Sequence, residues 1–402
     1  MLSSLFLDMN AYFASCEQQL RPYLRNCPIA VVPMIANTTC CIAASYEAKK
    51  FGIKTGTGVR EAKQLCPELK IVKARPEKYV EIHNQIIEAV ELCMPVTTVC
   101  SIDELYCKLM GIERHPDNAI KLAKQIKKTI YDRVGPYLKC SVGIGPNKFL
   151  SKVATNMQKP DGLVVIQEHE LPEKLYSLDL SDIPGIGRSM LRRLNKRDIT
   201  TMQQLCALSQ DDFKQIWESV VGIDMWKVLQ GQDVTEPPLR RKSVGHSHVL
   251  PPRLRTDDAA FAVIAKLIHK AAVRLRRLDY WAGQMYVRVI YDNGQRWKVR
   301  ASLGLCKDTV SMLEAFSLLW ENRPTNTSKP FQVGIVLTNL LHEKSVSIPL
   351  YEGQKKRLQI AYVVDRINEK LGLNSIYYGC IQHSLKEAPT RIAFTHIPEI
   401  FD

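Results

Sequence analysis

Three carboxylates stand at the ends of predicted strands, in two segments that lie far apart in the sequence. Asp8 follows the short apolar run of residues 4–7, and the adjacent Asp103 and Glu104 lie near the turn between two strands expected within residues 97–109. Phosphoryl transfer uses two divalent ions about 3.5–4 Å apart, and Mg²⁺ prefers carboxylate and phosphate oxygens as ligands. One carboxylate from one strand and two from a neighbouring hairpin could bridge both ions, although three unrelated surface acids are the alternative.

The elements expected around these acids alternate between helices and strands. Because the strands that must pair are separated by helical segments, the pattern predicts an α+β fold for this part of the chain. Predicted strands cover residues 4–7, 29–32, 40–44 and 140–145, and predicted helices cover residues 10–20, 45–51, 77–94 and 119–134.

The character of the chain changes near Leu180. A Pro-Gly-Ile-Gly turn at residues 184–187 predicts a hairpin between two short helices, and helical patterns continue to about residue 230. The charged, proline-containing stretch 231–242 predicts an exposed linker. Residues 243–350 then predict the order β-α-β-β-α-β, with an Asp-Asn-Gly turn between the middle strands, before a last helix and a short tail.

The composition is that of a basic, globular chain. It has 402 residues, 46% of them apolar, a net charge of +14 and an isoelectric point near 9.2. Such a charge favours a nucleic-acid partner, although a general surface excess of lysine is the alternative. The 12 cysteines include no C-x-x-C pair, which favours reduced thiols and a cytoplasmic location. Neither a signal peptide nor a membrane-spanning apolar run is expected.

Seven motifs, in a fixed order, carry a resemblance to a known family. They are residues 6–17 (FLDMNAYFASCE), 44–52 (ASYEAKKFG), 101–104 (SIDE), 141–148 (SVGIGPNK), 152–154 (KVA), 159–162 (KPDG) and 183–187 (IPGIG). Together they resemble the Y-family DNA polymerases, the lesion-bypass enzymes, of the bacterial polymerase IV and V type. The likeness is close over about residues 1–245 and looser beyond them.

The resemblance implies a right-handed polymerase fold with four domains. These would be a palm, small fingers, a helical thumb with a helix–hairpin–helix, and a β-α-β-β-α-β domain called the little finger. The implied ranges are palm 1–10 and 77–165, fingers 11–76, thumb 166–230, linker 231–242, little finger 243–350 and tail 351–402.

The resemblance also assigns the carboxylates to metal ions. Asp8, Asp103 and the main-chain carbonyl of Met9 would hold two Mg²⁺ ions, with Mn²⁺ as the other candidate, and Glu104 would be a further ligand near the primer 3′-hydroxyl. Many family members have aspartate where Asn10 stands, but some bacterial mutagenic polymerases of the family carry Asp-x-Asn-Ala, as this chain does at residues 8–11. The resemblance therefore does not imply that Asn10 is an essential ligand.

Five side chains match positions that contact the incoming nucleotide. Phe13 matches the steric gate, the ring that lies under the sugar and excludes a 2′-hydroxyl, with Tyr12 beside it; a plain core aromatic is the alternative. Tyr46, Lys49 and Lys159 match the positions that hold the triphosphate, where cations neutralise charge moving to pyrophosphate. Lysine at position 49 replaces the arginine that the family often has, and it loses the bidentate fork.

Two regions are expected to bind the DNA backbone. Gly185 and Gly187 lie in the hairpin turn, where backbone N–H groups could bind a phosphate, and Arg188 follows them. Residues 240–300, beginning with Arg240, Arg241 and Lys242, hold 14 Lys or Arg and 4 Asp, a net charge of +10. Binding through this segment would be independent of sequence and sensitive to salt.

A short apolar segment follows the predicted little finger. Ile348, Leu350 and Tyr351 are similar to a peptide that docks on the sliding clamp in related bacterial enzymes. The glutamine that usually opens such a peptide is absent, and an ordinary strand end is the alternative.

These features predict a low-fidelity, template-directed DNA polymerase that extends primers across damaged DNA without proofreading. Its partners would be primer–template DNA and deoxynucleoside triphosphates, with the chain acting as a monomer in DNA repair, the SOS response and mutagenesis. Two alternatives are a catalytically silent DNA-binding accessory subunit and a nucleotide cyclase. The intact acids argue against the first, and the hairpin and basic domain argue against the second.

Overall fold

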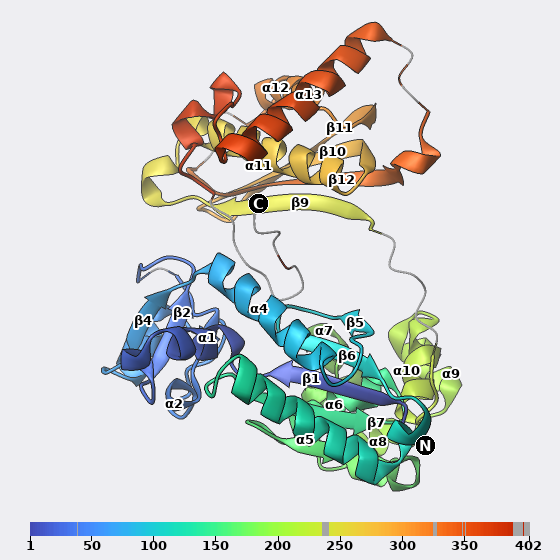
Figure 1. Cartoon of the computed structure of the whole chain (residues 1–402). Helices are drawn as coiled ribbons and strands as arrows, with labels where there is room; N and C mark the ends of the chain where they lie inside the picture. The colour runs from blue at the N-terminus through green and yellow to red at the C-terminus, as the bar shows by residue number, and fades with distance from the viewer. Residues whose placement is uncertain are drawn as a thin grey trace. The chain divides into compact units, whose positions relative to one another are not determined.

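The computed structural model describes residues 1–37, 39–234, 241–324, 328–347, 349, 351–388 and 397. The described chain divides into two compact units, one ending in the stretch 231–234 and the other beginning after residue 240 (Figure 1).

A five-stranded sheet forms the centre of the first unit, in the order β5-β6-β1-β7-β8. Its middle strand β1 is antiparallel to both β6 and β7, whereas β8 is parallel to β7. All six residues of β1 are buried, because both faces of the sheet are covered. The strands are β1 (Ser4–Met9), β5 (Thr98–Val99), β6 (Glu104–Lys108), β7 (Cys140–Gly145) and β8 (Leu163–Val165).

Helices cover the two faces of this sheet differently. The long amphipathic helices α4 (Pro76–Glu91) and α5 (Pro116–Arg133), each opened by a proline, lie on the face where Leu5 and Leu7 of β1 join the main core (Figure 1). The shorter α6 (Lys148–Met157) lies on the other face, where it contacts Phe6 and Tyr106. That second face carries the candidate active site.

Residues between β1 and α4 form a smaller layer around a three-stranded sheet, in the order β3-β2-β4. Of the strand expected at residues 40–44, only Ala43 and Ala44 form a strand. Cys40 instead makes an isolated bridge with Gly58, and the Cys41 N–H donates to the Thr57 carbonyl oxygen at 2.8 Å. The elements are α1 (Tyr12–Leu20), β2 (Ile29–Val32), β3 (Ala43–Ala44), α2 (Tyr46–Lys49), α3 (Val59–Leu65) and β4 (Lys70–Lys73).

The last part of the first unit is helical and has its own core. The helices are α7 (Arg188–Asn195), α8 (Met202–Cys206), α9 (Gln210–Trp217) and α10 (Val221–Leu229). The element before the hairpin turn is a single 3₁₀ turn, Leu180–Asp182, so the expected first helix of the hairpin is shorter than a full helix.

The second unit has the predicted order β-α-β-β-α-β, with an all-antiparallel sheet in the order β11-β10-β12-β9. Helix α11 begins at Thr256, whose hydroxyl caps the Ala259 N–H at 3.3 Å, with two aspartates in its first turn and arginines in its last. The elements are β9 (Ser243–Val249), α11 (Asp257–Arg277), β10 (Tyr280–Tyr291), β11 (Arg296–Cys306), α12 (Thr309–Glu321) and β12 (Pro330–His342).

The segment from residue 351 to residue 388 packs on this second unit rather than forming a separate tail. It contains α13 (Glu352–Leu371) and a 3₁₀ helix, Gly379–Ser384. The Arg276 guanidinium of α11 forms a bidentate pair with Asp365 of α13 at 2.7 and 2.8 Å. The buried Lys266 ammonium donates to three main-chain carbonyls of residues 384–387.

Candidate active site

The pairing of β1 with β6 brings the predicted carboxylates together. Asp8 and Glu104 are direct partners across the two antiparallel strands, and the Met9 N–H donates to the Asp103 carbonyl oxygen at 2.8 Å. Asp8 lies inside β1 rather than after it, and it is 7% exposed. A residue pair in register has side chains on the same face of a sheet, so Asp8 and Glu104 both point toward α6.

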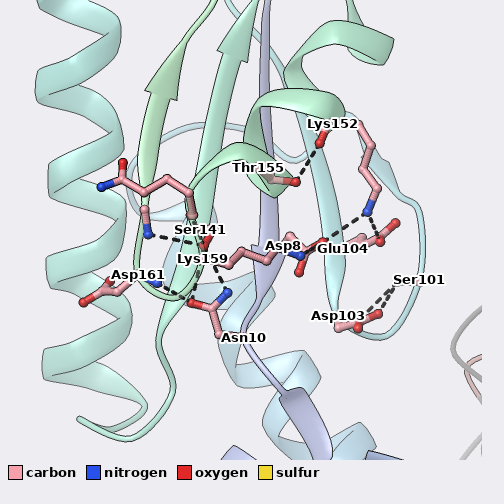
Figure 2. Close-up of polar contacts among 12 residues, drawn as sticks. Asp8, Asn10, Ser101, Asp103, Glu104, Ser141, Lys152, Thr155, Lys159 and Asp161 are labelled. Carbon is pink, nitrogen blue, oxygen red and sulfur yellow. Dashed lines mark hydrogen bonds and ion pairs between the residues drawn. The ribbon is translucent and has the colours of Figure 1, made fainter. Parts of the chain in front are cut away.

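Two lysines neutralise these acids in the structure (Figure 2). The ammonium of Lys152, on α6, lies 3.1 Å from Asp8 Oδ2 and also pairs with Glu104. The ammonium of Lys159 lies 2.9 Å from the same Asp8 oxygen. Helix α6 can approach the sheet this closely because β7 has glycine at position 143, where a Cβ would lie 2.0 Å from the Ser151 carbonyl oxygen.

Lys152 was part of a recognised motif, but sequence reasoning gave it no role. The spacing alone does not reveal that its side chain reaches two acids from a helix on the opposite layer. The motif of residues 141–148 contains one signal, since Asn147 caps α6 through the Leu150 N–H at 2.8 Å and so fixes which residues of the helix face the sheet.

Asp103 differs from its two neighbours, because its carboxylate accepts a hydrogen bond from the Ser101 hydroxyl. Burial raises the pKa of Asp103 to about 6, and the negative charges of Asp8 and Glu104 act in the same direction. Figure 2 shows Asp103 turned toward Ser101 and away from Lys152. A carboxyl with this pKa is partly protonated just below neutral pH.

The donors at this site fit a hard divalent cation in kind but not in arrangement. They are carboxylate oxygens whose negative charges lie close together, and the ammonium groups of Lys152 and Lys159 supply the compensating positive charge. Within the described ranges, no group of three or more His, Cys, Asp or Glu side chains is arranged to hold a metal ion. Metal binding would therefore require two changes. Lys152 and Lys159 would have to move away from Asp8, and the Asp103 carboxylate would have to turn away from Ser101.

Asn10 lies next to the acids, but its side chain is used elsewhere. It is 3% exposed, donates to the Ser141 hydroxyl at 3.1 Å and accepts from the Asp161 N–H at 2.7 Å. These bonds point away from the carboxylates toward the loop that carries Lys159 (Figure 2).

The residues expected to hold the triphosphate lie on α2 and the loop after α6. The Lys49 ammonium lies 4.2 Å from the centre of the Tyr46 ring. Burial, together with the charge of Asp8, raises the pKa of Tyr46 to about 12. Burial and the positive charge of Lys159 lower the pKa of Lys49. Lys159 pairs directly with Asp8, and the charge of Asp8 also acts on Tyr46 and Lys49.

The adjacent aromatics Tyr12 and Phe13 are both 1% exposed. The Tyr12 hydroxyl donates to the Tyr79 carbonyl oxygen at 2.6 Å, which commits that phenol to the core. Phe13 stacks on the Tyr79 ring with centroids 4.8 Å apart. The Tyr79 hydroxyl in turn donates to the buried Glu17 at 2.8 Å, so Phe13 rests on a fixed platform.

The hairpin turn presents backbone groups without side-chain cover. Gly185 has a φ of 90°, a left-handed conformation that favours glycine. Gly187 caps α7 with no side-chain hydrogen bond, and a Cβ there would meet nothing within 4 Å. Arg188, the first residue of α7, is exposed. The turn therefore has the geometry of an anion-binding helix start.

The cations of the second unit fall into two groups. Exposed cations share the outward face of β10 and β11. Arg288 is the cross-strand neighbour of Lys298, and Arg300 lies two residues further along β11 on the same face. Others are used inside the unit, such as Lys266 and Arg276. Arg241 and Lys242 are exposed, whereas Arg240 lies outside the described residues.

The expected clamp-docking segment is described only in part. Tyr351 is 74% exposed, and Ile348 and Leu350 lie outside the described residues.

Among the helices of the described residues, none combines the length and the apolar character that a membrane span requires.

Three family descriptions match successive parts of the chain. The impB/mucB/samB family matches residues 7–156, the helix–hairpin–helix motif of that family matches residues 169–199, and its C-terminal domain matches residues 241–350.

Curated relatives and solved structures agree with these matches. DNA polymerase IV of Pelotomaculum thermopropionicum is 31% identical over 382 residues, covering 92% of this chain and 93% of that protein. DNA polymerase IV of Bacillus velezensis is 29% identical over 399 residues, covering 93% and 92%. A solved Y-family DNA polymerase chimera of Dbh and Dpo4 shares 25% identity with a TM-score of 0.70, covering 85% of this chain and 99% of that one. An insertion ternary complex of Dbh DNA polymerase gives a TM-score of 0.57 at 25% identity, covering 85% and 99%.

The motif order, the α+β fold with its hairpin and little-finger domain, and the polymerase IV relatives lead to one assignment: the chain belongs to the impB/mucB/samB family, the Y-family of DNA polymerases.

Proposed function

We propose that this DNA-directed DNA polymerase extends primers past damaged template positions by two-metal nucleotidyl transfer and without proofreading. The observation that carries the proposal is the pairing of Asp8 with Glu104 across β1 and β6, beside Asp103. Three carboxylates crowded around the pairing of β1 with β6 are unfavourable without compensating cations, and the compensation here comes from the ammonium groups of Lys152 and Lys159.

Each residue then has a chemical task. Asp8, Asp103 and the Met9 carbonyl would hold the ions, and Glu104 would act near the primer 3′-hydroxyl. Bound Mg²⁺ or Mn²⁺ would lower the pKa of that hydroxyl and stabilise charge on the triphosphate.

The nucleotide would be held by groups that lie around Asp8. Lys159, freed from Asp8, would join Tyr46 and Lys49 on the triphosphate, where their charges oppose the charge developing on pyrophosphate. Phe13, supported by Tyr79, would lie under the sugar and exclude a 2′-hydroxyl.

The duplex would be gripped through its phosphates. The open amides at Gly187 and the cationic face of β10 and β11 are suited to sequence-independent contacts. We extend the proposal to a monomer that works in the cytoplasm and docks on a sliding clamp through residues 347–351. Deleting those five residues should weaken clamp pull-down without changing extension in its absence.

Primer extension on undamaged and abasic templates tests the proposal. The reaction would contain Mg²⁺ and four deoxynucleotides, beside the Asp103→Ala/Glu104→Ala variant. Short, distributive extension past the abasic site, absent in the variant, supports the proposal. Failure of the natural protein to extend, with DNA binding retained, would point to a catalytically silent accessory subunit.

A further inference from the structure

We propose that Asn10 is a positioning residue that sets the place of Lys159 through a relay of hydrogen bonds centred on Ser141. The inference rests on the proposed function, since it takes Lys159 as a triphosphate-binding group. It assigns a task to the buried side-chain amide of Asn10, which lies beside the acids but does not point toward them.

The loop of residues 158–162, which carries Lys159, closes on one hydroxyl. Ser141 Oγ, fully buried in β7, donates to the Gln158 carbonyl oxygen at 3.1 Å and accepts from the Gly162 N–H at 3.2 Å. The two ends of the loop are therefore fixed by the same atom. Between them, the ammonium of Lys159 reaches Asp8.

Asn10 completes this arrangement from β1. Its Nδ2 donates to Ser141 Oγ, and its Oδ1 accepts from the N–H of Asp161, which has a left-handed φ of 59°. Figure 2 shows the Asn10 side chain between Ser141 and Asp161, with one bond to each. The amide thus links the strand that carries Asp8 to the loop that carries Lys159, so the backbone of that loop keeps a fixed place relative to the strand.

Hydrogen-bond accounting explains why an amide is needed. A serine hydroxyl has one hydrogen, which goes to the Gln158 carbonyl oxygen at 3.1 Å rather than to Asn10 Oδ1 at 3.5 Å, and two lone pairs, which take Asn10 Nδ2 and the Gly162 N–H. A carboxylate at position 10 could still accept from Asp161 but could not donate to Ser141. It would compete for the only hydroxyl hydrogen, and the Gln158 carbonyl would lose its partner.

The loop has a second, independent anchor that should preserve folding in variants. The Lys127 ammonium, from α5, donates to the Asp161 carbonyl oxygen at 2.6 Å and pairs with its carboxylate at 2.8 Å. Loss of the Asn10 relay should therefore loosen the inner side of the loop without releasing it from the protein.

The first test is kinetic. Asn10→Asp and Ser141→Ala should each raise the KM for the incoming nucleotide on the order of tenfold, with kcat and DNA affinity changed by less than about threefold. In a Lys159→Met background the same changes should add less than about twofold, because the residue through which they act is gone. Thr155→Val is the matched control, since it removes a buried hydroxyl that donates to the Lys152 carbonyl oxygen at 2.7 Å and does not touch the loop.

The second test does not depend on activity. Hydrogen exchange at the Gly162 amide should speed up on the order of tenfold in Ser141→Ala, and at the Asp161 amide in Asn10→Leu. Asn10→Asp should keep the Asp161 amide protected, because it retains the acceptor. Unchanged exchange in Ser141→Ala and Asn10→Leu, or kinetic effects that add fully to those of Lys159→Met, would overturn the inference. Failure of primer extension by the natural protein would instead overturn the proposed function.

Discussion

Two charge clusters, one in each compact unit, use their ion pairs in opposite ways. In the first unit, the site cluster consists of the buried Asp8, its partners Lys152 and Lys159, and Asp103, and its ion pairs join residues of separate elements on one face of the sheet. In the second unit, the buried cations are tied to the fold: Arg276 is bound by Asp365 and by the Lys307 carbonyl oxygen at 2.8 Å. Three of its exposed cations, Arg288, Lys298 and Arg300, lie on the outward face of the sheet.

This difference distinguishes ion pairs whose cation can be replaced by another cation from ion pairs whose cation stays in place. A lysine ammonium that pairs with a carboxylate can be replaced by a divalent cation, which binds that carboxylate more strongly. The Arg276 guanidinium makes two hydrogen bonds to one carboxylate and another to a carbonyl oxygen, so it is held more firmly. We therefore expect substitutions in the site cluster to remove chemistry, and substitutions in the Arg276–Asp365 pair to lower stability.

The largest expected effect follows from removing one carboxylate of the strand pair. Asp8→Asn should lower the rate of single-nucleotide incorporation by about 10³-fold or more, because a metal ligand is lost. Rapid-quench kinetics at saturating DNA measures this rate. Glu91→Gln, an exposed acid at the end of α4, is the control and should change the rate by less than about twofold. Comparable losses of incorporation rate in both variants would contradict the distinction between Asp8 and an acid outside the site.

The buried pair of the second unit should control folding rather than chemistry. Arg276→Met should lower the free energy of unfolding by about 3 kcal/mol, because Asp365 is left without its partner. Thermal and denaturant unfolding measure the change. The adjacent Arg277→Met is the control, since the Arg277–Glu369 pair at 3.3 Å is half-exposed and worth less than about 1 kcal/mol. Equal destabilisation by both variants would contradict the comparison.

The exposed cations of the second unit should act on DNA affinity alone. The triple variant Arg288→Ala/Lys298→Ala/Arg300→Ala should weaken duplex binding on the order of tenfold and reduce the salt slope of log affinity by roughly two to three. Fluorescence anisotropy at several salt concentrations measures both quantities.

A matched control removes the same charge elsewhere. Lys121→Ala/Lys124→Ala/Lys128→Ala changes three exposed lysines of α5 in the first unit. An equal fall in affinity for both triples would mean that total charge, rather than the sheet face, binds DNA.

The smallest expected effect concerns the carboxyl that faces Ser101. Burial raises the pKa of Asp103 to about 6, above its ordinary value of 3.8, so the folded state favours the protonated form. The resulting stability is present at low pH and is lost as the pH rises toward 6. In metal-free buffer at pH 7, Asp103→Asn should therefore stabilise the protein by about 2 kcal/mol, with no gain below pH 4. A gain that persists at low pH would contradict this origin.

The sequence predicted more of the site than of its supporting contacts. The element order of the second unit and the family are confirmed, because motif order and hydrophobic period carry that information. Lys152 and the Asn10 relay were missed, since each depends on side chains brought together from separate elements. The net charge of residues 240–300 overstated the surface available to DNA, because Lys266 and Arg276 are used inside the unit.

The central claim is that Asp8, Asp103 and Glu104, where β1 pairs with β6, hold two divalent ions. Electron paramagnetic resonance of Mn²⁺ can count the ions in a complex with primer–template DNA and a non-hydrolysable deoxynucleotide. The account predicts two bound ions in the natural protein and at most one in Asp8→Asn with the complex still formed. Two ions retained in that variant, or none in the natural protein, would contradict it.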